Sequence, residues 1–191
     1  MEFFVTHQAV DHYSGDCSVA FASQDKSNDN RIIQTYLDLH RFEPKLASTL
    51  MLGKVEGYKS KRVLVVGLGE SPLTRKDFIK VLKSLSSAMG KAKVKNVVIP
   101  FIEVEDADEA WIQTSTARVL KNESYKVNKV GVQEEPSDIV LEAVNLYSKN
   151  NGASEIQKGV AVANGMALTR KLGDLPPNIC TPTYLADAAK S

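Results

Sequence analysis

Residues 61–102 read KRVLVVGLGESPLTRKDFIKVLKSLSSAMGKAKVKNVVIPFI, and this stretch decides the class of fold. An uninterrupted apolar run over 63–66 lies between charged residues and a glycine, which is typical of a central strand buried on both faces. A capping-box pattern then opens an amphipathic segment over 74–88, which predicts a helix. A second apolar run over 96–102 predicts another buried strand. Strand, helix and strand joined by a short return predict a right-handed parallel crossover.

The segments on either side continue this alternation of strands and helices. Cys17, Val19 and Phe21 alternate with smaller residues, which is the period-two pattern of a strand. Similar patterns predict further elements: strands over 3–5, 17–23, 129–132 and 138–144, and helices over 30–41 and 106–122. About six strands interleaved with helices predict an α/β fold, a three-layer sandwich whose mixed sheet is flanked by helices.

The segment Gly67-Leu68-Gly69 follows the central strand and admits two interpretations. A strand, a glycine-rich turn and a helix N-terminus can together cradle a phosphate. A dinucleotide-binding fingerprint requires a third glycine, however, and Pro72 holds that position. The pattern therefore favours a tight strand-to-helix turn over a nucleotide site.

The composition, 43% hydrophobic and 25% charged, is that of an ordinary globular protein. No apolar run approaches the roughly 18 residues that a membrane span needs. The N-terminus, MEFFVTHQ, lacks the basic and apolar regions of a signal peptide. Cys17 and Cys180 lie far apart, and without a secretory signal we expect both to be reduced thiols. The prediction is a cytoplasmic protein without a membrane partner.

The net charge of +1 conceals an asymmetry along the chain. Residues 45–95 include twelve basic and three acidic residues, whereas residues 96–158 include eleven acidic and six basic residues. Such a split can mark a basic face that meets a polyanion. Solvated surfaces of neighbouring elements produce the same pattern, and a lysine-rich helix face is usually of that kind.

The stretch 155–191 begins as a helix, breaks at Pro176-Pro177 and restarts at a new helix N-terminus. Thr181 suits the N-cap of the new helix, and Pro182 suits its first position, where a missing N–H has no cost. No glycine or asparagine follows to stop this helix before Ser191. We therefore expect the chain to be the front of a longer protein.

Residues 164–186 read NGMALTRKLGDLPPNICTPTYLA, and this segment resembles the junction between the two domains of leucyl aminopeptidases, the cytosol aminopeptidase family of metallopeptidases. The family pattern is a helix ending in Arg-x-Leu, then a proline and asparagine turn, then Thr-Pro and Leu-Ala. Segments 61–69 and 117–126 give weaker matches in the expected order. The junction positions, which we interpret as structural, are Arg170, Leu172, Pro176, Asn178, Thr181 and Pro182.

The resemblance implies three parts for the chain. These are a macro-domain-like N-terminal domain over 1–150, a linker helix over 151–175, and the start of an absent metallopeptidase domain over 176–191. In the family that absent domain holds two divalent metals, Mn or Zn, together with the catalytic residues. None of its motifs occurs here, and no HExxH or clustered His and carboxylate pattern replaces them. We therefore assign no catalytic, cofactor-binding or metal-binding residue to the chain.

Function is predicted accordingly: a non-catalytic N-terminal domain of an aminopeptidase that removes N-terminal residues from peptides. The resemblance also implies partners, namely the chain's own catalytic domain and the sibling subunits of a homohexamer. The isolated chain should be inert, and monomeric or weakly dimeric. ADP-ribose binding is a further hypothesis, which rests on the macro-like fold and on Gly67-Leu68-Gly69.

DNA contact is the alternative function. Some bacterial members of this family bind DNA as well as cut peptides, and the basic excess over 45–95 offers a surface for it. Lysines on such a surface would contact phosphates without reading bases. The candidate contacts are Lys76, Lys80, Lys83, Lys91, Lys93 and Lys95.

Overall fold

A computed structural model describes residues 1–25, 30–125 and 141–190 of the chain. Within these residues, six strands form one sheet in the order β1-β6-β5-β2-β4-β3. All neighbouring pairs are parallel except β3 and β4, which are antiparallel at one edge. The mixed sheet confirms the predicted α/β fold, while the closer likeness to macro domains stays a prediction. The strands are β1 (Glu2–Thr6), β2 (Cys17–Ala22), β3 (Thr49–Leu52), β4 (Arg62–Gly67), β5 (Asn96–Ile99) and β6 (Ala143–Tyr147).

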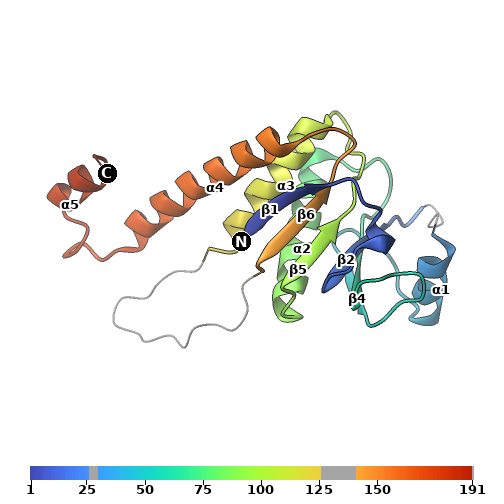
Figure 1. Cartoon of the computed structure of the whole chain (residues 1–191). Coiled ribbons are helices and arrows are strands. Elements are labelled where there is room, and N and C mark those ends of the chain that lie inside the picture. The colour runs from blue at the N-terminus through green and yellow to red at the C-terminus, as the bar shows by residue number, and fades with distance from the viewer. Residues whose placement is uncertain (26–29, 126–140, 191) are drawn as a thin grey trace.

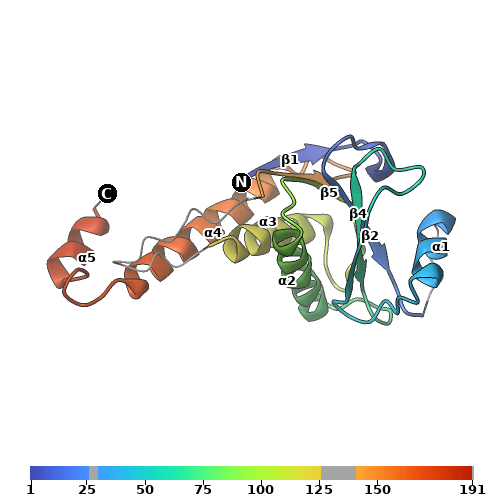
Figure 2. The ribbon, with the colours of Figure 1, turned by 90° about the horizontal axis from the view of Figure 1, so that it is seen from below.

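Helices cover both faces of the sheet and form the outer layers of the sandwich. Helix α1 (Arg31–Leu39) lies on one face, and α2 (Arg75–Lys91) and α3 (Glu109–Glu123) lie on the other (Figure 2). A short 3-10 helix, η1 (Val10–His12), precedes β2. Helix α4 (Ala153–Asp174) runs along α3 and out from the sheet, and it carries α5 (Pro182–Ala188) away from the sandwich (Figure 1).

Strand β4 is buried on both faces, as the apolar run predicts. Val63 and Val65 pack into the core beneath α1, whereas Leu64 and Val66 pack into the core beneath α2 and α3. All four side chains are 0% exposed. Because successive side chains of a strand point to opposite faces, a continuous apolar run serves both cores at once. This strand therefore fixes the layering of the molecule.

Two strands differ from the expected pattern. Strand β3 was not predicted, because it is a four-residue edge strand whose side chains are mostly part-exposed and give little alternation. The strand expected over 138–144 is β6, which begins only at Ala143 and ends at Tyr147. Its ladder starts where the Lys95 carbonyl accepts hydrogen bonds from the amides of Glu142 and Ala143, at 2.7 and 3.1 Å. The strand expected over 129–132 lies outside the described residues.

Helix boundaries follow the capping residues. Thr74 caps α2, its hydroxyl accepting from the Asp77 amide at 3.2 Å, as the capping-box pattern predicts. Helix α2 passes the expected end at 88 and continues to Lys91. Helix α3 begins at Glu109 and not at Asp106, because Asp106 has a φ of 54°, which lies outside the right-handed helical region. The Asp108 side chain caps the helix instead.

Helix α4 has two differently packed halves. Up to Ala163 it lies against α3, and Ile156, Gly159 and Ala163 are buried there. From residue 164 to 190, a segment that we name the arm, no residue is fully buried. None of the helices in the described ranges is both long and apolar enough to cross a membrane.

Candidate functional site

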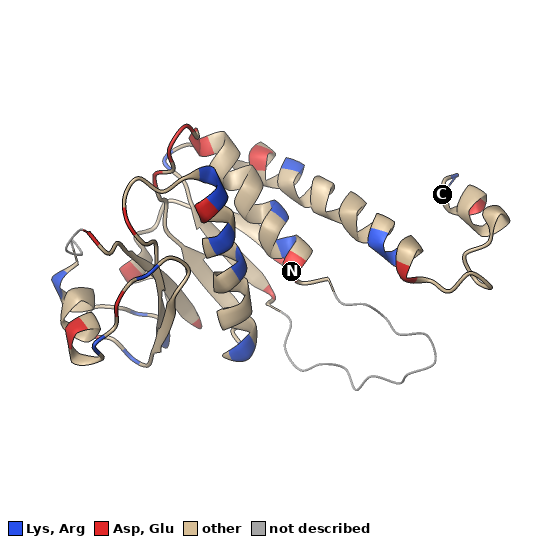
Figure 3. Ribbon diagram, turned by 180° about the vertical axis from the view of Figure 1, so that it is seen from behind, with Lys and Arg blue, Asp and Glu red and all other residues tan. Residues whose placement is uncertain are grey.

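Four of the six lysines proposed for phosphate contact lie along α2. Lys76, Lys80, Lys83 and Lys91 are exposed, and at a rise of about 1.5 Å per residue they span roughly 22 Å of the helix. Figure 3 shows these basic bands running down α2 with a single acidic band among them. The acidic residue of α2 is Asp77, and hydrogen bonds from Lys80 and Thr74 hold the pKa of its carboxyl below the usual value. We name these four lysines the α2 row.

The other two lysines lie apart from the α2 row. Lys93 and Lys95 belong to the segment between α2 and β5, and both line a hollow of about 530 Å³ at the amino ends of the parallel strands. The structure therefore divides the predicted set of six into a linear group and a concave group. We name the hollow the basic bowl. Its charged lining residues are Asp16, Lys59, Lys61, Arg62, Lys93 and Lys95.

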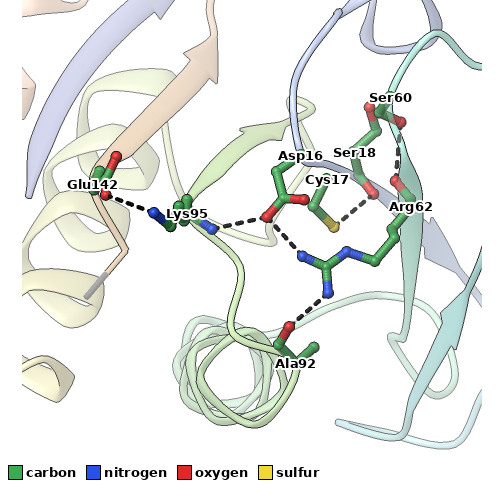
Figure 4. A network of polar contacts seen from close by, with 8 residues as sticks. All are labelled: Asp16, Cys17, Ser18, Ser60, Arg62, Ala92, Lys95 and Glu142. Atoms are coloured by element: carbon green, nitrogen blue, oxygen red, sulfur yellow. Dashed lines mark hydrogen bonds and ion pairs between the residues drawn. The ribbon is translucent and has the colours of Figure 1, made fainter. Parts of the chain in front are cut away.

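An ion pair between two neighbouring strands forms the floor of the basic bowl. Arg62 begins β4 and donates to Asp16 Oδ2, just before β2, at 2.7 Å (Figure 4). Its other Nη donates to the Ala92 carbonyl at the end of α2, at 2.6 Å. The Lys95 amide donates to the same Asp16 oxygen at 2.9 Å. These bonds tie the start of β2 to the start of β4, to the end of α2 and to the segment before β5.

Sequence reasoning missed Lys59 and Lys61 as members of this group. The order β5-β2-β4 explains how the group forms. The segments that precede parallel strands lie at the same end of the sheet, beside the amino ends of the strands. The basic residues before β4 therefore approach those before β5, with Asp16 between them. A signal existed, because Lys59, Lys61 and Arg62 precede one predicted strand and Lys91, Lys93 and Lys95 precede the next.

The turn at Gly67-Leu68-Gly69 has a structural explanation. Its three amides donate to carbonyls of Ser48, Ala22 and Pro44, at 2.8, 2.8 and 3.0 Å. A Cβ at Gly67 would lie 2.2 Å from the Lys45 carbonyl oxygen, and Gly69 has a φ of 73°. Because these amides already have partners inside the protein, they are not available to cradle a phosphate.

The junction residues lie at the helix end and the turn, as their positions predict, while their roles stay predictions. The Thr181 hydroxyl caps α5 by accepting from the Tyr184 amide at 3.3 Å, with Pro182 at the first helical position. The Pro176 carbonyl accepts from the amides of Ile179 and Cys180, at 2.9 and 3.0 Å. Leu172 is part-buried and Asn178 is exposed.

Arg170 lies over the ring of Tyr125, 5.8 Å from its centroid. The Tyr125 hydroxyl donates to Asp174 Oδ2 at 2.9 Å. Tyr125 follows the end of α3 and belongs to the second of the weaker family matches, over 117–126. The fold therefore brings the junction segment and this upstream segment together, through the contacts of Arg170 and Asp174 with Tyr125.

A part-buried polar cluster joins α3 to the start of α4. Glu109 accepts from Ser148 Oγ at 2.6 Å and from Asn150 Nδ2 at 2.9 Å, and Gln113 donates to Ser148 Oγ at 2.8 Å. Burial raises the pKa of the Glu109 carboxyl, but hydrogen bonds from Ser148, Asn150 and two backbone amides outweigh it, so the pKa is lowered overall. The cluster fixes the turn from which α4 departs.

No group of three His, Cys, Asp or Glu side chains that could hold a metal occurs in residues 1–25, 30–125 and 141–190. Both cysteines are free. Cys17 is 0% exposed, and burial raises the pKa of its thiol to about 12, so it is protonated at neutral pH and a poor nucleophile. The donor set for a metal-dependent hydrolase is not present in this part of the chain.

Comparison with known proteins identifies the family of the chain. Residues 10–130 match the N-terminal domain of the cytosol aminopeptidase family. The chain belongs to this family. All of the chain aligns with a "Probable cytosol aminopeptidase" of Vesicomyosocius okutanii subsp. Calyptogena okutanii, with 36% identity over 191 residues and 40% of that protein covered. A protein of the same description from Nitrosomonas europaea is 29% identical over 208 residues, with 100% of the chain and 42% of that protein covered.

Two solved structures share the fold. A mutant of tomato leucine aminopeptidase superposes with a TM-score of 0.74 and 18% identity, covering 100% of this chain and 41% of that one. The bottromycin maturation enzyme BotP in complex with Mn superposes with a TM-score of 0.69 and 17% identity, covering 92% and 35%. The chain thus spans about two fifths of the length of the curated relatives that it matches.

Proposed function

We propose that this chain is the non-catalytic N-terminal part of a cytoplasmic aminopeptidase, whose other residues hydrolyse N-terminal residues from peptides with two divalent metals, Mn or Zn. One observation carries the proposal: the whole chain aligns with 40% of a relative described as an aminopeptidase. The described residues do not fit a two-metal centre, because no three suitable side chains converge. Metal binding is therefore assigned to the rest of the protein.

The role of the chain in such an enzyme is to support and position the catalytic part. The proposed parts are a domain over 1–150, a linker helix over 151–175 and the first residues of the catalytic domain over 176–191, and the change in packing along α4 lies within the linker helix. Val162, Leu168 and Leu185 are 50%, 52% and 49% exposed. Exposed apolar side chains on consecutive helices favour burial against another surface. The proposed occupant is the catalytic part, within a homohexamer of such subunits.

A chimaera tests the proposal. The residues that follow the matched part of the V. okutanii relative are fused after Ser191, and hydrolysis of leucine p-nitroanilide is measured with Mn²⁺ or Zn²⁺. The full-length relative is the positive control. We expect hydrolysis by the chimaera and none by the chain 1–191 alone. Hydrolysis by the purified chain alone would overturn the proposal.

A second candidate function, DNA contact, is favoured by the geometry of the α2 row. Four exposed lysines in a line of roughly 22 Å suit the phosphates of a duplex, which are contacted without base reading. Four phosphate contacts predict a slope of about −3.6 for the logarithm of the binding constant against the logarithm of salt concentration. A mobility shift titrated at several salt concentrations measures this slope. Absence of binding at low salt would end the proposal.

A further inference from the structure

We propose that the basic bowl is a binding site for a small condensed phosphate, such as inorganic triphosphate. Five of its lining side chains are cationic and one, Asp16, is anionic. They come from segments that are distant in sequence and meet only because β2 lies between β4 and β5. A hollow whose walls carry one sign of charge concentrates the field and attracts counter-ions.

The charge of Asp16 is already balanced inside the protein. Its side chain is 15% exposed, and the same oxygen accepts from Arg62 at 2.7 Å and from the Lys95 amide at 2.9 Å. Arg62 is held in turn between Asp16 and the Ala92 carbonyl (Figure 4). The ion pair therefore forms a rigid floor and contributes little net charge. The positive field of the bowl comes from its lysines.

Four lysines line the bowl beside this floor, and all four residues are exposed. They are Lys59, Lys61, Lys93 and Lys95. Lys95 Nζ lies 3.6 Å from Glu142 Oε1, and both side chains are more than half exposed. An exposed pair at that distance is weak, so Lys95 can turn to a ligand at small cost. Ser14 and Asn96 add a hydroxyl and an amide that can donate to oxygen.

The lining selects the class of anion. None of the nine lining residues is aromatic, so the bowl has no aromatic ring on which a nucleobase could stack. Lysines act as compact point charges that suit phosphate oxygens. The cationic residues line a hollow, whereas the contacts of a duplex follow a line, as the α2 row does. These features favour a short chain of phosphates over a nucleotide or a nucleic acid.

The experiment is calorimetric titration of the chain 1–191 with sodium triphosphate at low ionic strength. The test variant replaces the four bowl lysines: Lys59→Gln, Lys61→Gln, Lys93→Gln and Lys95→Gln. The matched control makes the same change of charge on the α2 row: Lys76→Gln, Lys80→Gln, Lys83→Gln and Lys91→Gln. All eight residues are exposed, and circular dichroism checks that both variants keep the fold.

We expect the bowl variant to weaken binding by about 30-fold and the control by less than about threefold, since exposed charges at a distance are screened. Three results would overturn the proposal. The first is no heat of triphosphate binding at low salt, and the second is equal weakening of triphosphate binding in both variants. The third is that a DNA duplex binds and triphosphate does not, with duplex binding lost in the bowl variant. Duplex binding that is lost only in the control variant would assign DNA to the α2 row and support a separate site in the bowl.

Discussion

The two halves of α4 have the same backbone conformation but opposite surroundings. Its first half, up to Ala163, packs against α3, with Gly159 so close that an added Cβ would lie 2.3 Å from the Thr114 carbonyl oxygen. Its second half lies in the arm, where Gly165 and Gly173 have no other atom within 4 Å of such a Cβ and Leu168 is 52% exposed. The difference indicates that the first half of α4 is stabilised by packing against α3, whereas the second half makes side-chain contacts such as those of Arg170 and Asp174 with Tyr125 and has no fully buried residue.

Truncating a leucine in each region gives the largest contrast. Leu85 is 0% exposed in α2, and Leu85→Ala should lower the free energy of unfolding by about 2–5 kcal/mol, through lost burial and the cavity left behind. Leu168→Ala, the same chemical change in the arm, should alter it by less than about 0.5 kcal/mol. Urea unfolding measures both. A large effect at Leu168 would show that the arm packs against the sandwich.

Glycine-to-alanine substitutions on the two halves of α4 should have opposite signs. Gly159→Ala forces α4 away from α3 and should destabilise the chain by about 1–3 kcal/mol. Gly165→Ala meets no neighbouring atom and should stabilise its helix by about 0.5–1 kcal/mol, because alanine has the higher helix propensity. Thermal unfolding and helix content by circular dichroism measure the pair. Equal signs would contradict the division of α4 into two halves.

Removing the N-cap of α2 should lower the stability of the whole fold, whereas removing the N-cap of α5 should affect α5 alone. Thr74→Ala removes the cap of α2, which packs in the core, and should cost about 1 kcal/mol in global unfolding. Thr181→Ala removes the cap of α5, in which no residue is buried, and should leave global unfolding unchanged. Its effect should be confined to faster amide exchange within α5. A global loss from Thr181→Ala would mean that α5 belongs to the cooperative unit.

The pH dependence should report on Glu109 at the base of α4. Because its folded pKa is below the usual value of 4.5, the stability it contributes is complete above that pH and is lost as the pH falls through the lowered pKa. The variant Glu109→Gln should be less stable at neutral pH and should lose less stability on acidification than the original chain. Glu56→Gln, at an exposed site, serves as the control. Urea unfolding from neutral pH to below 4.5 measures the free energy of unfolding of each variant and of the original chain. Parallel curves for Glu109→Gln and the original chain would contradict this role.

Short sequence patterns predicted the features that depend on neighbouring residues alone, such as helix caps and helix breaks. The run Val63–Val66 identified a strand that is buried on both faces, Thr74 and Thr181 identified two caps, and Pro176-Pro177 identified the break after α4. Strand β3 gave no such signal, because an edge strand buries little of its surface. Its position depends on pairing with β4, which a local pattern does not contain.

The candidate site was predicted only in part for the same reason. Three members of the α2 row, Lys76, Lys80 and Lys83, could be read from helical spacing, whereas Lys91 lies beyond the expected end of the helix at 88. The basic bowl could not, because it depends on β2 lying between β4 and β5 and on Asp16 joining Arg62 and Lys95. Residues that are distant in the sequence form that site, so only the topology brings them together.

Amide hydrogen exchange along α4 tests the central claim most directly. In the chain 1–191, we expect the amides of 157–163 to exchange only through global unfolding, because their helix face is buried against α3. The amides of 167–174 should exchange at least about 100-fold faster, because an exposed helix end is only marginally stable. Equal protection along the whole of α4 would contradict the claim that the arm is held less firmly than the first half of α4, with Arg170 and Asp174 contacting Tyr125 but no arm residue fully buried.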